Sequence, residues 1–290
     1  MKWYFILILT IVLSCNEKEL KTASVAFYNL ENLFDTEPDS SSINEPFTPE
    51  GEKKWDQVGY TNKLKNLAKV IGELANGGAP TFLGVCEVEN KKVLEDLIAQ
   101  PSLKKENYAI VHIDSPDERG IDVGFIYKKS IFTVEHFTAH QPDLSYCKDL
   151  TRDILHVQGK VINGETLHFI INHWPSRGGG SEASESKRIA AATTLNNIKV
   201  SILKTEPNAK IIVMGDFNDE PSDKSIAEVL DVSCNQSNTA KGQFFNAFCD
   251  IEKAGKGSYL YRDSWDMLDQ IMVSSTLLSD TNAIHFKNNS

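Results

Sequence analysis

Short apolar runs alternate along this 290-residue chain with segments whose apolar residues recur at helical spacing. Gly, Asn or Pro follows several of the runs, which is typical of strands bounded by turns. The turn pair Asn163-Gly164 between two such runs predicts a β-hairpin. We expect strands over residues 24–28, 82–85, 108–113, 123–127, 132–137, 155–162, 167–172, 210–214 and 267–273.

Three helices are predicted between these strands. Leu64, Leu67 and Ile71 follow helical spacing, and the polar sequence 76–78 ends that helix. A second helix is expected over residues 93–100, and a long third one begins near Ser181. Hairpins mixed with interleaved helices indicate one mixed α/β domain with packed sheets.

The N-terminus has the pattern of an export signal. An apolar run from Trp3 to Leu13 follows Lys2 and precedes Ser14 and Cys15. The run is about half of the roughly 20 residues that span a bilayer, so it fits a signal peptide better than a membrane helix. A small residue before Cys15 resembles the lipobox of bacterial lipoproteins, in which the cysteine is lipidated; the alternative is an ordinary cleaved signal.

We therefore divide the chain into a signal peptide with a lipobox cysteine (1–15), a tether (16–22) and a folded domain (23–290). The protein is expected to be exported and held by its lipid in the outer leaflet of a bacterial membrane, in the periplasm or at the cell surface. In that oxidising compartment four cysteines remain after Cys15, and they allow three pairings. Cys234 and Cys249 close a short loop and are the favoured pair.

Charge argues against a protein that wraps duplex nucleic acid. The formal net charge is −10, and no run of Lys or Arg exceeds two residues. A protein that binds nucleic acid by counterion release usually has a basic surface. Bound divalent metals could still supply positive charge that composition does not count.

Acids and amides cluster where several predicted strands end. An amide, a histidine or an acid stands in or at the end of five apolar runs, namely Asn29, Glu87, His173, Asp216 and Asp269. One acid at a strand end is usually a turn former, but five together indicate a site. Oxygen ligands of this kind suit Mg²⁺ or Mn²⁺. Gly215 was expected to let the backbone turn, so that Asp216 and Asn218 share one face.

These motifs carry a family resemblance. Four motifs occur in the order found in the endonuclease/exonuclease/phosphatase superfamily: Tyr28-Asn29, Glu87, the stretch from Asn172 to Arg177 and the stretch from Gly215 to Asn218. The similarity covers residues 23–274. The resemblance implies a four-layer α/β/β/α sandwich of two packed mixed sheets, and we expect a monomer. Its site would lie on the rim where the strand ends of both sheets meet.

The resemblance also assigns roles around a metal. Asn29 and Glu87 would hold the catalytic Mg²⁺ or Mn²⁺, and Glu31 would contribute through a water molecule. Asp216 would orient or deprotonate the attacking water. Asn218 would donate a hydrogen bond to the phosphoryl group.

Further roles concern the histidines and the substrate. His173 would contact the scissile phosphate, and Asp122 would orient it and raise its pKa. Asp269 matches the acid that orients the family's second, C-terminal histidine. Arg177 could bind a phosphate, and Trp174 could stack on a base or simply pack.

One motif of the family is missing. No Ser-Asp-His sequence occurs in the chain, and Ser279-Asp280 is followed by Thr281. His285, in what looks like a polar tail, is expected to be a surface residue. We therefore expected a truncated chain that lacks its last strand.

The sequence thus predicts a metal-dependent phosphodiester hydrolase. A nuclease acting on nucleic acid is favoured. The alternatives are a phosphatase or phospholipase-type phosphodiesterase of the same superfamily, or a catalytically inactive surface binding module.

Overall fold

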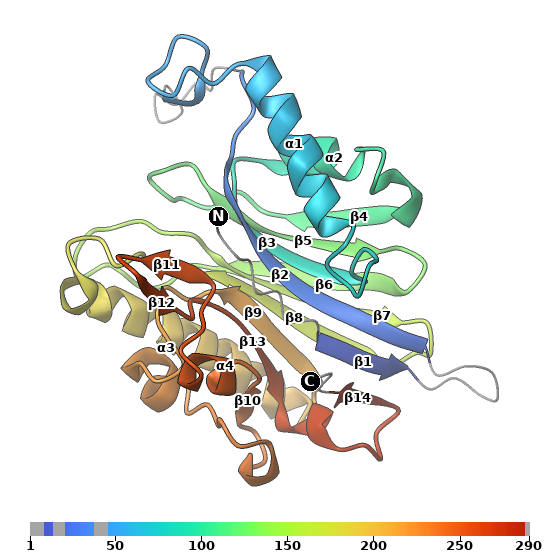
Figure 1. Cartoon of the computed structure of the whole chain (residues 1–290). Coiled ribbons are helices and arrows are strands. Elements are labelled where there is room, and N and C mark those ends of the chain that lie inside the picture. Colours follow the sequence, from blue (N-terminus) through green and yellow to red (C-terminus); the bar gives the residue numbers. More distant parts are fainter. Residues whose placement is uncertain (1–8, 14–20, 38–45, 288–290) are drawn as a thin grey trace.

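Two β-sheets pack face to face between helices in the computed structural model, which describes residues 9–13, 21–37 and 46–287 (Figure 1). β2 runs parallel to β3 and β8 parallel to β9, whereas the flanking pairs are antiparallel. The predicted four-layer sandwich of two mixed sheets is confirmed. Across the first sheet the order is β14 (Ile284–Lys287), β1 (Leu9–Leu13), β2 (Lys21–Leu33), β3 (Phe82–Val88), β5 (Asp122–Lys128) and β4 (Tyr108–His112). Across the second it is β10 (Phe244–Asn246), β13 (Asp269–Ser274), β9 (Ile211–Asp216), β8 (Thr166–His173), β7 (Ile154–Val161) and β6 (Phe132–His140).

The helices cover the outer faces of the sheets (Figure 1). α1 (Gln57–Ile71) and α2 (Lys91–Ile98) pack on the first sheet, and α3 (Ser181–Thr205) packs on the second. α1 and α2 begin at side-chain caps, because Asp56 and Asn90 accept hydrogen bonds from the backbone amides three residues later. The predicted helices are present, although α1 begins one and a half to two turns earlier than its first apolar residue suggested.

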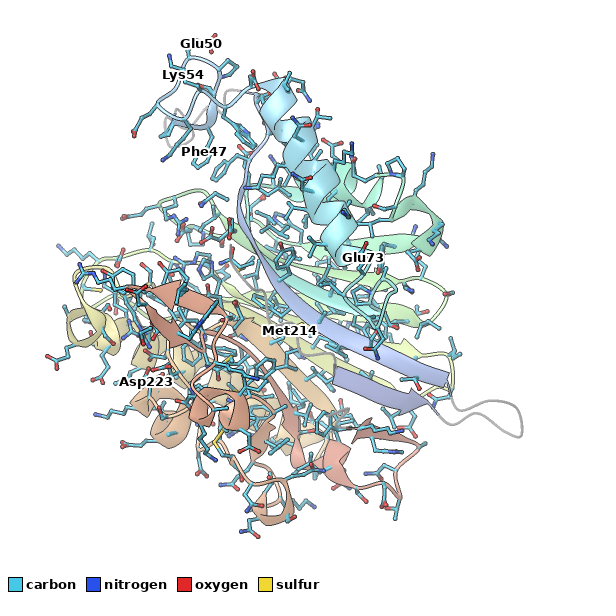
Figure 2. All side chains as sticks on the ribbon, viewed as in Figure 1. Phe47, Glu50, Lys54, Glu73, Met214 and Asp223 are labelled. Carbon is cyan, nitrogen blue, oxygen red and sulfur yellow. A yellow bond between two sulfur atoms is a disulfide. The ribbon has the colours of Figure 1, made fainter. Side chains whose placement is uncertain are left out.

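The core between the sheets is aromatic. Phe82 on β3 packs on Phe169 of β8 with ring centroids 4.6 Å apart, and both are fully buried. Met214 on β9 lies at the centre of this interface (Figure 2) and faces Gly84, where an added Cβ would come within 2.5 Å of its sulfur. The two sheets therefore pack closely at this point, with no room for a side chain at Gly84 unless Met214 moves.

Two segments differ from expectation. Residues 284–287, expected as polar tail, form β14, in which Ile284 is buried and Phe286 packs near Phe245. Leu9–Leu13, within the predicted leader, forms β1 between β2 and β14. An apolar run rich in β-branched residues has strand propensity and can pair with an open sheet edge. Cys15 lies outside the described residues, so the leader and its lipidation stay predictions.

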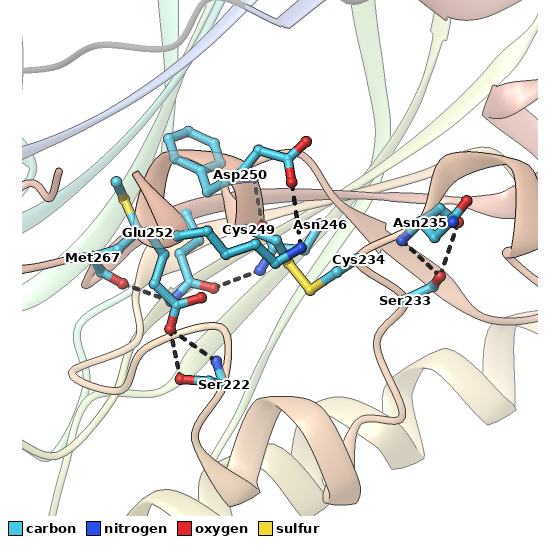
Figure 3. Close-up of a disulfide and its surroundings, with 12 residues drawn as sticks. Ser222, Ser233, Cys234, Asn235, Asn246, Cys249, Asp250, Glu252 and Met267 are labelled. Carbon is cyan, nitrogen blue, oxygen red and sulfur yellow. Dashed lines mark hydrogen bonds and ion pairs between the residues drawn. A yellow bond between two sulfur atoms is a disulfide. The ribbon is translucent and has the colours of Figure 1, made fainter. Parts of the chain in front are cut away.

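A disulfide between Cys234 and Cys249 is confirmed (Figure 3). It joins a loop to α4 (Cys249–Lys253), a short helix that follows β10. Cys86 is a buried free thiol and Cys147 an exposed one. Among the described residues, no helix has the length and apolar character needed to cross a membrane.

Candidate active site

The ends of β2, β3, β8 and β9 meet at one rim and surround a pocket of about 880 Å³. His173 and Asp269 each pair with Asp216 in the strand register, so three polar residues of neighbouring strands lie abreast. Most of the residues predicted for the site line this pocket: Asn29, Glu31, Glu87, His173, Arg177, Asp216, Asn218 and Asp269.

The backbone at this rim is unusual. Glu31, Asn32, Glu87 and Asn218 all have positive φ angles, between 50° and 60°. The β2–β3 and β3–β5 pairings shift register at the same level. Left-handed residues other than glycine are energetically unfavourable, and such bulges redirect side chains at functional sites. The strain therefore coincides with the residues that the sequence had singled out.

Asp216 joins the two sheets. Its Oδ2 accepts a hydrogen bond from Nδ2 of Asn29 at 3.1 Å, and its Oδ1 accepts one from the Asn218 amide at 3.0 Å. Both bonds favour the carboxylate. Burial nevertheless raises the pKa of Asp216 above its ordinary value, and the nearby charge of Glu87 acts in the same direction.

A second buried acid lies beside it. Burial, and then the charge of Asp216, raises the pKa of Asp269 well above its ordinary value. The Oδ1 atom of Asp269 is buried and has no hydrogen-bond partner within the described part of the chain. Carboxylates that repel one another and an unsatisfied oxygen are what a divalent cation would relieve. The oxygens of Asn29, Glu87, Asp216 and Asp269 around this pocket are of the chemical type that Mg²⁺ or Mn²⁺ binds. Within the described residues, Cys86, His173 and Asp216 each bring one ligand atom within 4.8 Å of the others.

His173 is held close to these acids. Its Nε2 lies 4.0 Å from Oε1 of Glu87 and 3.9 Å from Oδ2 of Asp216, while its buried Nδ1 has no partner among described residues. Burial lowers the pKa of His173 well below its ordinary value, and Arg152 and Arg119 lower it further. The imidazole is therefore neutral at pH 7, in contrast to the raised pKa that we expected.

The structure does not place Asp122 against His173. Oδ2 of Asp122 bonds Nε2 of His112 at 3.0 Å, and Oδ1 accepts the Ser115 amide at 2.7 Å. Asp122 begins β5, and β4 brings His112 alongside it. The carboxylate is thus satisfied by its own edge of the first sheet and does not line the pocket.

Arg177 and Trp174 are engaged by the protein itself. The guanidinium of Arg177 bonds the Asn218 carbonyl at 2.8 Å, Asp223 at 2.9 Å and Asp266 at 3.4 Å. Trp174 is 1% exposed and packs edge-on against a phenylalanine. Arg177 lines the pocket with its hydrogen-bonding capacity largely used, and Trp174 is a core residue.

Two arginines near the site were not predicted from the sequence. Arg119 lines the pocket, with Nη2 3.5 Å from Oε1 of Glu87. Arg152 forms a buried ion pair with Asp117 at 3.0 Å. Both arginines come from polar loops without a motif. His285 is on β14, does not line the pocket and bonds a nearby backbone carbonyl.

A four-layer sandwich that brings an asparagine, carboxylates and a histidine to one rim defines a class of metal-compatible hydrolases of phosphate esters. The chain belongs to the Endonuclease/Exonuclease/phosphatase family, whose profile matches residues 24–290.

Solved structures share this fold at low sequence identity. A mannosyl-6-phosphatase from Bacteroides thetaiotaomicron is 16% identical, with a TM-score of 0.56 over 87% of this chain and 85% of that one. An endonuclease/exonuclease/phosphatase family protein from the same organism is 16% identical, with a TM-score of 0.54 over 93% and 84%. Truncated TDP2 from Caenorhabditis elegans is 16% identical, with a TM-score of 0.54 over 77% and 80%. No curated protein matches the chain.

Proposed function

We propose that this chain is an exported hydrolase of phosphate esters that depends on Mg²⁺ or Mn²⁺. One observation carries the proposal: side chains from the rim ends of four strands in two different sheets converge on a single pocket. Their hydrogen bonds, burial and unsatisfied oxygen all fit a bound divalent cation. The family supports the same reaction class.

Asn29 and Glu87 would hold the cation, with Asp216 and Asp269 near it. When bound, the cation would neutralise phosphate oxygens and stabilise the leaving oxygen. Asp216 would orient the attacking water and take its proton. Its two hydrogen bonds fix its position for this role.

His173 and Asn218 would bind the phosphate. Because His173 is neutral, it would contribute a hydrogen bond rather than a charge. The side-chain amide of Asn218 donates one N–H to the Trp174 carbonyl at 2.9 Å, and its second N–H remains for a phosphate oxygen. Donors fixed in advance in this way stabilise charge that develops in the transition state.

Substrates with a single phosphate are favoured over nucleic acid. Within the described residues the pocket is lined by five acids and two arginines, and one of those, Arg177, is already bound by protein groups. A polyanion would find little positive charge beyond the metal. Two neighbours with the same fold are named a mannosyl-6-phosphatase and a 2',3'-cyclic phosphatase. A nuclease remains the second candidate, because the stretch from Asn172 to Arg177 resembles the deoxyribonuclease pattern.

The test uses the purified chain with a sugar phosphate, a dye phosphodiester, plasmid DNA and RNA, in Mg²⁺, Mn²⁺ or EDTA. We expect EDTA-sensitive hydrolysis that Asp216→Asn abolishes and that Asp143→Asn, a fully exposed control, leaves intact. Calorimetric titration with Mn²⁺ gives a second readout, in which Glu87→Gln should weaken binding. Metal binding without turnover of any substrate would instead indicate a non-catalytic binding module.

Export is a separate part of the proposal. The disulfide Cys234–Cys249 supports it, because such bonds persist in oxidising compartments. Lipidation predicts that the protein follows the membrane fraction and that Cys15→Ser releases it. Retention of the Cys15→Ser variant in that fraction would contradict the anchor.

A further inference from the structure

A small hairpin beside the pocket exposes an unusual cluster of large side chains. β11 (Tyr259–Tyr261) and β12 (Ser264–Asp266) form a two-stranded sheet apart from the two main ones. Tyr259, Leu260 and Tyr261 are 45%, 41% and 50% exposed. In a strand that packs on a core, alternate residues are buried. Here none is buried, so burial does not explain these residues, and such exposed patches usually bind something.

The two tyrosines form a platform. Their rings are stacked, with centroids 6.4 Å apart and planes 14° from parallel. The hairpin turn is formed by Arg262 and Asp263, which both have positive φ, as tight hairpin turns require. Arg262 lies over the Tyr261 ring at 5.0 Å and covers one of its faces. Tyr259, which is 45% exposed, therefore offers the more open ring of the pair.

The hairpin is tied to the acids of the site. The Ser258 amide donates to the Asp266 carbonyl at 2.9 Å, and the Ser258 hydroxyl accepts the Asp269 amide at 2.9 Å. Asp266 in turn bonds Arg177. These contacts hold the base of the hairpin in a fixed position relative to Asp269.

The aromatic residues line the same pocket as the proposed catalytic groups. Tyr259, Leu260, Tyr261 and Trp265 border the cavity that also contains Asp216. A ligand whose phosphate lies by Asp216 can thus extend toward the hairpin. On this side the pocket is lined by aromatic side chains. Its described lining contains two arginines, Arg119 and Arg177, and no cluster of positive charge that could bind further phosphates.

We infer that the β11–β12 hairpin binds the ring of a substrate that carries one phosphate ester on a neutral ring-bearing group. The inference rests on the proposed function and adds to it the substrate class. The shared chemistry is a ring face, either the C–H groups of a sugar or the π-face of a base, that packs on a tyrosine ring. A sugar phosphate and a mononucleotide both provide it, and the experiment separates them.

The first measurement compares kcat/KM for glucose 6-phosphate, adenosine 5'-monophosphate and glycerol 3-phosphate, which has no ring. Wild type should prefer one of the ring-bearing esters. Replacing both tyrosines, Tyr259→Leu with Tyr261→Leu, should reduce that preference about tenfold, whereas Tyr261→Phe should retain it. Leucine keeps an apolar strand residue, so the hairpin is conserved while its rings are removed. Tyr146→Leu, at a 60% exposed tyrosine outside the pocket, is the matched control.

A binding measurement keeps the inference independent of turnover. Benzylphosphonate and propylphosphonate are titrated by calorimetry in Mg²⁺. Wild type should bind the ring compound about tenfold more tightly, and the double leucine variant should lose the difference. Absence of hydrolysis with this ring preference intact would reject the proposed function alone. Equal affinities in wild type, or a preference that survives in the double leucine variant, would overturn the hairpin assignment alone.

Discussion

Gly215 of β9 lies against Asn172 of β8, directly beside Asp216. An added Cβ would lie 2.5 Å from the carbonyl oxygen of Asn172 and 2.6 Å from its Cβ. Its φ is not positive, so the glycine is required for space rather than for the turn that the sequence suggested. We predict that Gly215→Ala destabilises the fold and displaces Asp216. The comparison variant is Gly84→Ala, where the added Cβ would meet the Met214 sulfur at the same 2.5 Å.

The two substitutions differ in what must move. Contacts of a Cβ atom essentially never fall below 3.0 Å and are ordinary from 3.4 Å. Because the added Cβ in Gly215→Ala would lie 2.5 Å from β8, that strand would have to move away by 0.5 to 0.9 Å. The 3.3 Å bond from Nδ2 of Asn172 to the Met214 carbonyl would then exceed hydrogen-bond length. Losing this bond and a neighbouring hydrogen bond between the strands costs about 1 kcal/mol each, and the remaining steric misfit costs about as much again. We therefore expect Gly215→Ala to lower the free energy of unfolding by about 3 kcal/mol. In Gly84→Ala a flexible thioether moves instead, so we expect about 1 kcal/mol.

Urea unfolding of wild type and both variants measures these free energies. The reasoning is refuted if Gly215→Ala is no less stable than Gly84→Ala, because the clash distances are equal and only the rigidity of the partner differs. Hydrolysis and Mn²⁺ affinity give a second comparison. Both should fall in Gly215→Ala beyond the loss of folded protein, since Asp216 is the next residue.

Three further predictions concern groups outside this contact. Burial and two neighbouring histidines lower the pKa of His156 from 6.5 to about 4. Because the unfolded chain then takes up this proton at a higher pH than the folded chain, the contribution of His156 to the free energy of unfolding should be complete above pH 6.5 and decline as the pH falls toward 4. Urea unfolding at pH 7.5 and 4.5 measures how much the free energy of unfolding falls between the two pH values. This fall should be smaller in His156→Gln by up to about 3 kcal/mol, and an equal fall in wild type and variant would contradict the prediction. Cys234→Ser should cost about 3 kcal/mol, since the disulfide closes a 15-residue separation, and Cys147→Ser should cost under about 0.5 kcal/mol in the same assay. Asp122→Asn should cost about 1–3 kcal/mol of stability without altering the pH–rate profile, and a shifted profile would show that Asp122 acts on His173 after all.

The strand-end motifs were predictable because each follows an apolar run that defines a strand, and the Asn163-Gly164 hairpin was predictable from its turn residues. The bond from Asn29 to Asp216 was not, since 187 residues separate the two and their contact depends on how the sheets stack.

Side-chain partners were the least predictable feature. Asp122 pairs with His112 because the register of β4 and β5 brings them together, and no pattern in either strand reports that register. Arg188, near the start of α3, is 1% exposed and bonds Asp219 at 2.5 Å, although an arginine at such a position is usually a surface charge. Its burial depends on a loop that follows β9.

The arginines near the site explain how an acidic protein could act on an anionic substrate. Arg152 is paired with Asp117, Arg188 with Asp219, and Arg177 with Asp223 and with Asp266 of β12. The Arg152 and Arg188 pairs are buried, and breaking a buried pair typically costs about 3–5 kcal/mol. These guanidinium groups therefore hold rim loops in place and are not free to bind phosphate. Arg119 is the other arginine of the pocket, so most of the positive charge for a phosphate would come from the proposed cation. The net charge of −10 is compatible with that proposal, because a bound divalent metal dominates the local field.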